Sequence, residues 1–325
     1  MNIRTADAEV TISTPAKLNL YFEVLAKRPD GFHEIETLMV PIDCYDTLVF
    51  CDTAVTADRP AGSPIELVCD WATGMRLADG AGAGSYQAAP DLPPAMLESL
   101  PTGSGNIVVR AVELLRQRTG TEKNGAIRLV KRIPSAAGLG GGSSDAAAAL
   151  VAANLAWQVG WSRRQLADLA AELGSDVPFF LQNGSAICRG RGELIEPVTG
   201  LGKLHFVVVR PPVGLSTAEV YRSCQPSKLA KSCNVKELVC SLRLGDWRRL
   251  PSQLLNALEP PARKLSPWIE RLSNEFARLD CLAAQMSGSG TSYFGVCRSA
   301  RQARIAAAKL RSRKLGLVFT ATSIS

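Results

Sequence analysis

One stretch decides the fold of this 325-residue chain: Pro134-Ser135-Ala136-Ala137-Gly138-Leu139-Gly140-Gly141-Gly142-Ser143-Ser144. Glycine fills four of the five positions 138–142, and glycine lets a ligand approach the backbone and permits unusual dihedral angles. The residues that follow, 145–153, are rich in alanine and favour a helix. A glycine loop that opens a helix offers unpaired N–H groups and the positive end of the helix dipole, so the stretch predicts a phosphate-binding loop.

The loop matches neither of the two common glycine-rich nucleotide-binding motifs. A P-loop requires lysine after its last glycine, and Ser143 stands there instead. The dinucleotide motif requires a third glycine, and Ser143 again occupies that position. A flexible surface loop in front of an alanine-rich helix is the alternative interpretation.

The composition is that of a soluble globular protein with room for two domains, because 46% of the residues are hydrophobic and 21% are charged. No apolar run approaches the ~20 residues that span a bilayer. Residues 1–10 include acids and lack an apolar core, so they resemble neither a secretory signal nor a transit peptide. Nine scattered cysteines without a CxxC pair argue against a disulfide framework or a zinc site, so we expect free thiols and a cytoplasmic protein.

The net charge of +7 is unevenly distributed. Residues 1–162 contain 13 Lys and Arg against 18 Asp and Glu, and residues 163–325 contain 24 against 12, so the halves carry −5 and +12. A basic half is compatible with nucleic-acid binding, but its basic residues are dispersed. Attraction of a small polyanionic substrate explains the charge equally well, and we expect neither a nucleic-acid nor a membrane partner.

Strand and helix patterns interleave without a regular βαβ period, which predicts an α+β fold. We expect two domains: residues 1–198 with the nucleotide-binding and catalytic groups, and residues 199–325 as the C-terminal domain. Residues 54–105 are rich in glycine, alanine and proline and predict an irregular insertion, within which residues 65–69 could form a strand.

Local signals predict the main elements. Asn106 before an amphipathic run and Gly120 after it predict a helix between them. A capping box at 162–165 opens a second helix, which Gly174 ends. Strands are expected over 10–21, 37–50, 126–133, 204–210, 292–297 and 317–322, and a late helix over 299–314.

Two polar residues interrupt an apolar strand pattern near the N-terminus. Lys17 and Asn19 lie in the run 14–20, and residues two apart on a strand face the same side. Lysine is rarely buried without a partner, so Lys17 is a candidate to meet a transferring phosphoryl group. An exposed lysine on an edge strand is an equally good interpretation.

Asp176 is a lone carboxylate in the apolar run 173–180. We expect Pro178 to force an extended path after Gly174, which would hold Asp176 on a constrained turn. Asp176 could be a general base oriented by Lys17, or could simply bond its own backbone. Asp145 is expected to be a first-turn acid that complements the dipole of the loop helix.

A late glycine cluster, Met286-Ser287-Gly288-Ser289-Gly290-Thr291, precedes the strand expected over 292–297. It is either a plain turn or a second set of backbone N–H groups near the phosphates. Taken together, the runs 14–20, 134–144 and 287–291 resemble the GHMP kinase superfamily, whose phosphate loop has the pattern PxxxGLGSSAA. The resemblance implies a two-domain fold, with a ribosomal-protein-S5-like N-terminal domain and a ferredoxin-like α/β sandwich at the C-terminus.

Within this superfamily four ordered motifs are similar to the kinases of the non-mevalonate isoprenoid pathway that phosphorylate the 2-hydroxyl of 4-diphosphocytidyl-2-C-methyl-D-erythritol. These motifs span residues 15–19, 28–33, 140–145 and 174–179. The resemblance covers nearly the whole chain apart from residues 54–105, which are longer than expected for the family.

The resemblance implies catalytic roles for Lys17 and Asp176. Asp176 would accept the proton of the acceptor hydroxyl, while Lys17 would keep Asp176 ionised and stabilise charge as the γ-phosphoryl of ATP arrives. Residues 134–144 would wrap the triphosphate, with the backbone N–H groups of Gly140 to Ser144 as donors. ATP is therefore the expected co-substrate, with Mg²⁺ bridging its phosphates through protein ligands that the sequence does not assign.

The resemblance also implies a site for the cytidyl diphosphate substrate. His33 matches the family's cytosine-reading histidine, and Asn19 is expected at the substrate. Phe32 stands where tyrosine is usual, and its ring can still stack on cytosine. Tyr221 matches a second stacking position, and ordinary core packing is the alternative interpretation for both rings.

Three functions remain open at this point. The first is phosphorylation of the cytidyl diphosphate substrate. The second is a GHMP kinase for another alcohol, of the mevalonate or homoserine type. The third is a non-catalytic nucleotide sensor that keeps the loop and has lost the chemistry, which the presence of both Lys17 and Asp176 disfavours.

Overall fold

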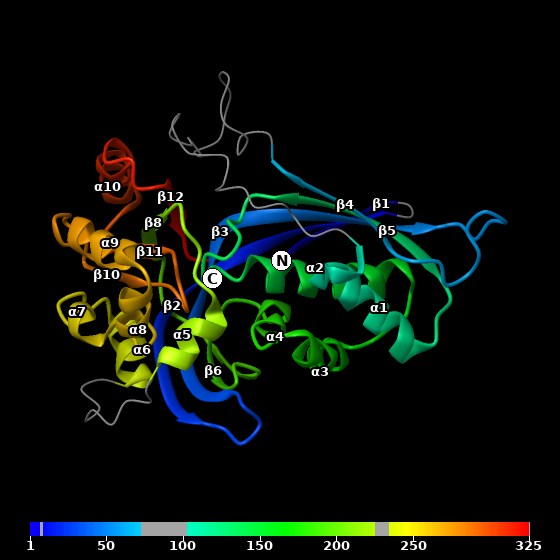
Figure 1. The fold of residues 1–325 in the computed structure, drawn as a ribbon, viewed down its shortest axis with the longest axis horizontal. Coiled ribbons are helices and arrows are strands. Elements are labelled where there is room, and N and C mark those ends of the chain that lie inside the picture. The colour runs from blue at the N-terminus through cyan, green and yellow to red at the C-terminus, as the bar shows by residue number, and fades with distance from the viewer. Residues whose placement is uncertain (7–8, 73–102, 225–233, 325) are drawn as a thin grey trace.

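A computed structural model describes residues 1–6, 9–72, 103–224 and 234–324. Its strands form two sheets, one of eight strands and one of four (Figure 1). The larger sheet contains β1 (Asn2–Ala6), β2 (Glu9–Lys27), β3 (His33–Thr53), β4 (Glu66–Trp71), β5 (Asn124–Lys131), β6 (Ser185–Gly190), β7 (Leu194–Val198) and β9 (Leu255–Asn256). The smaller sheet contains β8 (His205–Arg210), β10 (Ala283–Met286), β11 (Tyr293–Cys297) and β12 (Leu317–Thr322).

Strands β2 and β3 are long and antiparallel, with 19 and 21 residues, and they extend from one half of the molecule into the other (Figure 1). Their pairing shifts register at three places, between Pro15 and Ala16, Asn19 and Tyr21, and Val24 and Ala26. Such irregularities bend a strand and redirect its side chains. The two candidate residues of β2 therefore lie on a curved segment between two register shifts.

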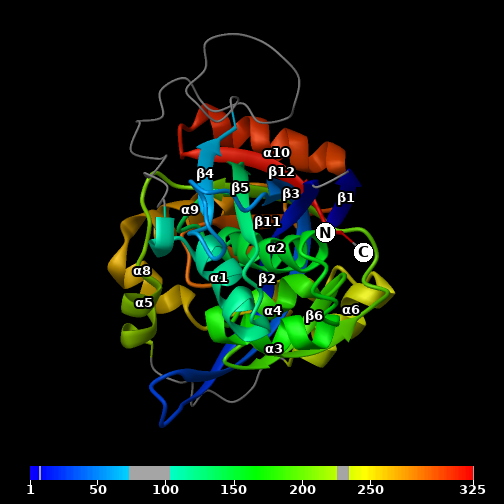
Figure 2. The same ribbon diagram turned by 90° about the vertical axis from the view of Figure 1, so that its right-hand side faces the viewer.

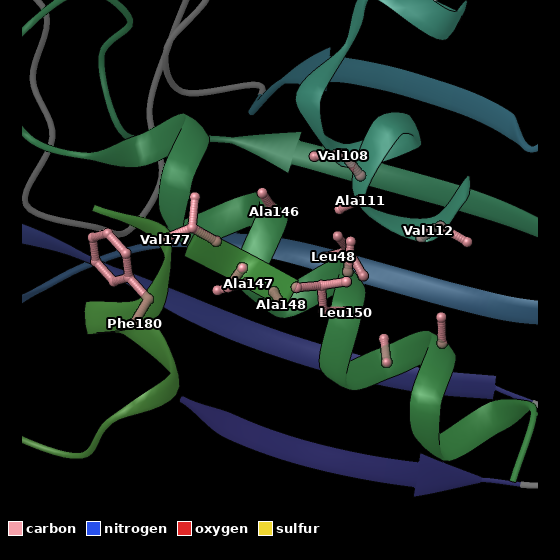
Figure 3. Close-up of a cluster of buried hydrophobic side chains, with 14 of the residues drawn as sticks. Leu48, Val108, Ala111, Val112, Ala146, Ala147, Ala148, Leu150, Val177 and Phe180 are labelled. Carbon is pink, nitrogen blue, oxygen red and sulfur yellow. The ribbon is translucent and has the colours of Figure 1, made fainter. Parts of the chain in front are cut away.

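Helix α2 (Gly141–Ala156) is the helix that the glycine loop opens, and it is packed between the large sheet and α1 (Ile107–Thr119). Its alanines allow close approach, and Figure 3 shows them facing residues of β3, α1 and the following helices. Figure 1 shows α1 to α4 gathered on one side of strands β1 to β5. The remaining members of this layer are α3 (Arg163–Leu173) and α4 (Val177–Leu181).

The C-terminal half builds the four-stranded sheet in the order β10-β11-β8-β12. Helix α10 (Ala300–Ser312) packs against β8, β11 and β12, and Figure 2 shows it lying beside β12. The other helices of this half are α5 (Thr217–Ser223), α6 (Val235–Leu244), α7 (Leu250–Gln253), α8 (Glu259–Leu265) and α9 (Pro267–Ala277).

The α+β class and the local capping signals are confirmed. Asn106 caps α1 by accepting from the N–H of Val108, and Gly120 ends it in the left-handed conformation. The capping box of Ser162 and Gln165 opens α3. A strand does occur within the first part of the predicted insertion, as β4, while residues 73–102 lie outside the described residues.

The division at residue 198 stays a prediction, and the two halves are joined closely where they meet. Strand β9 from the second half pairs with β2, and one hydrophobic cluster contains residues of both halves. Eight described cysteines are free thiols. Among the described helices, none is both long enough and apolar enough to cross a membrane.

Candidate active site

A cavity of about 1250 Å³ brings together most of the residues that the sequence selects. Its wall includes Lys17, Asp176, the glycine loop over 134–143, and residues 288–290 of the late glycine cluster. Phe32, His33 and Tyr221 also line it. These segments are far apart in the sequence, so the cavity is a product of the tertiary fold.

Lys17 and Asp176 form an ion pair, with 3.4 Å between Nζ of Lys17 and Oδ2 of Asp176. The lysine side chain is buried (4% exposed), whereas the aspartate is 30% exposed and accessible from the cavity. Lys17 Nζ also donates to Oδ1 of Asn19 at 2.6 Å, as expected for residues two apart on one strand. The Asn19 amide in turn donates to Thr37 Oγ1 on β3 at 2.8 Å, so the ammonium group is held by a chain of hydrogen bonds.

Asp176 precedes α4, and Pro178 lies in the first turn of that helix. The prediction of an extended path after Gly174 is therefore wrong. Proline is compatible with a first helical turn because the N–H that it lacks would have no partner there. Asp176 accepts no capping hydrogen bond from its own helix, so its carboxylate is directed to Lys17.

The glycine loop needs glycine at two positions for steric reasons. Gly138 has φ +73°, and a Cβ added there would lie 2.1 Å from the carbonyl oxygen of Ser287. Gly140 has φ +72°, and its Cβ would lie 2.9 Å from the ring of Phe180 and 3.0 Å from Cγ of Lys17. The loop therefore lies directly against the lysine and against the late glycine cluster.

Ser287 connects the late glycine cluster to the loop and to β2. Its hydroxyl donates to the carbonyl of Gly138 at 3.0 Å and accepts from the N–H of Asn19 at 3.3 Å. The N–H of Ser292 donates to the carbonyl of Ala137 at 3.1 Å. The cluster is therefore part of the loop's support rather than a separate turn.

Helix α2 begins at Gly141, with Gly140 as its N-cap, so its first N–H groups have no partner within the helix and can bind an anion. Ser144 differs from the predicted donors. Its N–H donates to Gly140, and its hydroxyl donates to the carbonyl of Pro15 at 2.6 Å. The predicted donor set therefore shortens to residues 140–143, and Ser144 fixes the helix to β2.

Asp145 is not the first-turn acid that the sequence predicts. It lies in the second turn of α2, is 2% exposed, and accepts from Nζ of Lys131 at 2.5 Å. Lys131 also donates to Asp46, which lies in β3. We call Asp46, Lys131 and Asp145 the buried triad. The cationic partner Lys131, rather than the helix dipole, explains the position of Asp145.

The buried triad holds both ends of the glycine loop. The carboxylate of Asp46 accepts from the backbone N–H of Ile133 at 2.8 Å and from that of Arg132, so it fixes the residues that enter the loop. Asp145 follows the last residue of the loop, and Lys131 joins the two carboxylates. An ion triad thus fixes the span between strand β5 and helix α2.

Burial and mutual charge shift the pKa values within the buried triad. Burial lowers the pKa of Lys131, but the two carboxylates outweigh burial and raise it above its ordinary value. Burial raises the pKa of Asp145 well above its usual range; Lys131 opposes this shift and Asp46 adds to it. Oδ1 of Asp145 is buried without a hydrogen-bond partner among the described residues, which also disfavours its ionised form.

The aromatic residues lie at another part of the cavity wall. The rings of His33 and Tyr221 pack with centroids 5.0 Å apart, and Phe32 is 49% exposed. The guanidinium of Arg191 lies over the ring of Phe32, with Cζ 4.8 Å from its centroid. Burial and the nearby Lys27 lower the pKa of His33, so its neutral imidazole has one donor and one acceptor at pH 7.

The sequence did not predict a role for three residues that line the cavity or hold the glycine loop. Lys131 is the last residue of β5, which also contains Arg128 and is followed by Arg132, so the sequence does not single it out as Lys17 is singled out. Asp46 is one of two acids, with Asp43, in the otherwise apolar part of β3. Arg191 stands between Gly190 and Gly192, a pattern that gives only a weak indication of a turn.

Two family models match the chain: the GHMP kinases N terminal domain over residues 106–184 and the GHMP kinases C terminal domain over residues 236–315. The glycine loop and Asp176 lie within the first match. The chain belongs to the GHMP kinase family.

Similar proteins within this family are named as one particular kinase. The 4-diphosphocytidyl-2-C-methyl-D-erythritol kinase of Pelotomaculum thermopropionicum is 41% identical over 96% of this chain and 98% of its own length. The protein of the same name from Alkaliphilus metalliredigens is 35% identical over 92% and 91%.

Solved structures agree on the architecture. A 4-(cytidine 5'-diphospho)-2C-methyl-D-erythritol kinase superposes with a TM-score of 0.74 and 30% identity, over 97% of this chain and 99% of that chain. The homoserine kinase of Cytophaga hutchinsonii, at 18% identity and a TM-score of 0.68 over 99% and 96%, shares the fold. The two-domain α+β fold is therefore that of the GHMP kinases.

Proposed function

We propose that this chain is an ATP-dependent kinase that phosphorylates the 2-hydroxyl of 4-diphosphocytidyl-2-C-methyl-D-erythritol. The observation that carries the proposal is the ion pair of Lys17 and Asp176 beside the glycine loop, within one cavity that also contains His33. Relatives of that name match over nearly the full length of the chain. The proposed substrate is a small anion, which suits the basic second half of the chain.

The side chains fit phosphoryl transfer to an alcohol. Asp176 would accept the proton as the O–H bond breaks, while the oxygen forms a bond to the γ-phosphorus and the bond to the β-phosphate oxygen breaks. Lys17 lies 3.4 Å from Asp176 and can stabilise both the carboxylate and the transferred phosphoryl group. The N–H groups at the start of α2 would bind the triphosphate.

In the proposed reaction, Mg²⁺ would bind together with ATP. The described residues contain no group of three or more His, Cys, Asp or Glu side chains that could hold a metal ion by themselves. Mg²⁺ commonly takes most of its ligands from phosphates and water, with one or two protein groups, so the site suits a nucleotide-borne ion.

We also propose that the chain works in the cytoplasm, with residues 1–198 and 199–325 as its two domains. The eight free thiols of the described residues support a reducing compartment. The separate sheets of the two halves support the division, although β9 crosses it.

A comparison of acceptor alcohols tests the proposed function. We expect ATP-dependent turnover with the cytidyl diphosphate substrate and none with mevalonate or homoserine, measured as ADP release. Turnover of mevalonate or homoserine alone would replace the proposal with another kinase of the family. ATP binding without turnover of any of these alcohols would instead favour the nucleotide sensor.

His33→Ala is expected to raise KM for the cytidyl substrate by about 10- to 100-fold, because a base-reading hydrogen bond is lost. KM for ATP should change little, since His33 lies against Tyr221 rather than at the glycine loop. Initial rates with each substrate varied in turn provide the measurement. A fall in ATP affinity instead would contradict the role in cytosine recognition.

A further inference from the structure

The cytidyl substrate carries a diphosphate between its base and its polyol, and this group is not matched by any of the residues discussed so far. If the base lies near His33 and the acceptor hydroxyl lies near Asp176, the diphosphate must lie between them. Two negative charges entering a partly buried cavity need cationic partners, because desolvated anions are costly without them. This reasoning rests on the proposed function.

Five of the described residues that line the cavity are lysine or arginine: Lys17, Lys27, Lys131, Arg191 and Arg222. Lys17 is paired with Asp176, and Lys131 is paired with Asp46 and Asp145. Three cations at the wall therefore remain to be compared as partners for the diphosphate.

Arg191 lies between the two ends of the proposed substrate. It occupies the turn from β6 to β7, and a Cβ on the next residue, Gly192, would lie 3.7 Å from Oδ1 of Asp176. Its guanidinium lies over the ring of Phe32, 4.8 Å from the centroid. The backbone of this turn thus lies beside the catalytic carboxylate, while the side chain reaches the predicted cytosine platform.

The guanidinium lies near two carboxylates: Asp30, with which it interacts electrostatically, and Glu193. Glu193 accepts the backbone N–H of Arg191 at 2.6 Å, but its carboxylate lies 3.7 Å from Nε, which is a long ion pair. Its cation–π contact with the Phe32 ring also helps to hold the group in place. A guanidinium so placed presents a planar set of donors, which matches phosphate oxygens better than an ammonium does.

The other two cations fit less well. Lys27 lies at the end of β2, is exposed, and pairs in register with His33 beside the base-reading end. Arg222 lies in the last turn of α5, where its Nε donates to the carbonyl of Ala218 at 3.4 Å.

We propose that Arg191 binds the diphosphate of the cytidyl substrate and thereby selects a nucleoside diphosphate over the bare nucleoside. The residue is a binding and positioning group, and no proton or phosphoryl group passes through it. The Phe32 ring would then stack on the pyrimidine with one face and contact the Arg191 guanidinium with the other.

The affinities of CDP and cytidine, measured by calorimetry with saturating ADP present, test this assignment. ADP occupies the glycine loop, so CDP cannot bind there instead. In the unmodified protein we expect CDP to bind about 10- to 100-fold more tightly than cytidine, the range of charge-assisted hydrogen bonds. In Arg191→Met the two affinities should become nearly equal, while the affinity for cytidine stays close to its original value. Arg191→Lys should keep part of the preference.

Two control variants separate Arg191 from its neighbours. Arg189→Met removes a cation from strand β6, where Arg189 pairs with Glu36 and Glu196 outside the cavity wall, and it should keep the preference for CDP. Lys27→Met should also keep it. A preference lost in Lys27→Met and retained in Arg191→Met would overturn the assignment. Absence of cytidine and CDP binding in the unmodified protein would instead reject the cytidyl substrate, and with it the proposed function.

Discussion

Asp176→Asn is expected to lower kcat by about 10²- to 10⁴-fold, the range for loss of a general base. The substitution keeps the shape of the side chain but removes the charge that lies 3.4 Å from Lys17. ATP affinity should change little, because the proposed phosphate donors belong to α2 and the loop before it. Single-turnover kinetics and nucleotide binding, measured on the same preparation, separate the two effects.

A control and a double variant make this result specific. Asp168→Asn alters an exposed acid of α3 and should leave turnover unchanged. Lys17→Met should also reduce kcat strongly, and the double variant Lys17→Met with Asp176→Asn should be little worse than either single variant, because the two groups act as a unit. Full turnover in Asp176→Asn would remove this carboxylate from the mechanism.

Lys131→Met is expected to destabilise the protein by about 3–5 kcal/mol, because it leaves two buried carboxylates without their cation. Lys131 is 4% exposed, Asp46 0% and Asp145 2%, so solvent compensates little of the charge that the two carboxylates would carry. Denaturant unfolding monitored by circular dichroism gives the free energy of unfolding. Lys123→Met is a suitable control, because Lys123 forms a half-exposed pair with Asp52 and such pairs contribute about 0–1 kcal/mol.

The destabilisation should depend on pH with a definite sign. The pKa of Asp145 is raised in the folded protein, chiefly by burial, so the unfolded chain releases this proton first as the pH rises. The contribution of Asp145 to the free energy of unfolding therefore falls as the pH rises above the ordinary pKa of an aspartate. Removal of Lys131 raises the pKa of Asp145 in the folded protein further. The deficit of Lys131→Met should be smaller at acidic than at neutral pH, and Lys131→Met with Asp145→Asn should recover part of it at neutral pH. A deficit that grows on acidification would contradict the buried triad.

Much of the local structure could be predicted because its causes are local. Asn106 and Gly120 mark the ends of α1 by their own capping chemistry, and alternation along β2 places Lys17 and Asn19 on one side. The pairing of Lys17 with Asp176 was predicted only through the family resemblance. No spacing in the sequence shows that residues 159 positions apart lie in contact.

The wrong predictions have two physical origins. Asp145 follows a helix start closely enough to look like a dipole partner, but the lysine that decides its position lies on a neighbouring strand. Pro178 disfavours helix at the residue before it in general, yet a first turn tolerates it. Ser144 lies in the phosphate loop by motif, while Pro15 and Gly140 already use its donors. For Asp145 and for the hydroxyl of Ser144, a contact distant in sequence overrides a local preference. For Pro178, one local preference overrides another.

The contact of Gly138 with Ser287 limits which halves of related chains can be combined in one protein. The glycine loop belongs to the first half of the chain and packs against Ser287 in the second half, so closely that a Cβ added at Gly138 would lie 2.1 Å from the carbonyl oxygen of Ser287. A chimera that takes its two halves from different homologues must therefore keep compatible residues on both sides of the contact between the glycine loop and Ser287. Chimeras split near residue 198 should succeed only when the donor supplies a matching turn at 287–291.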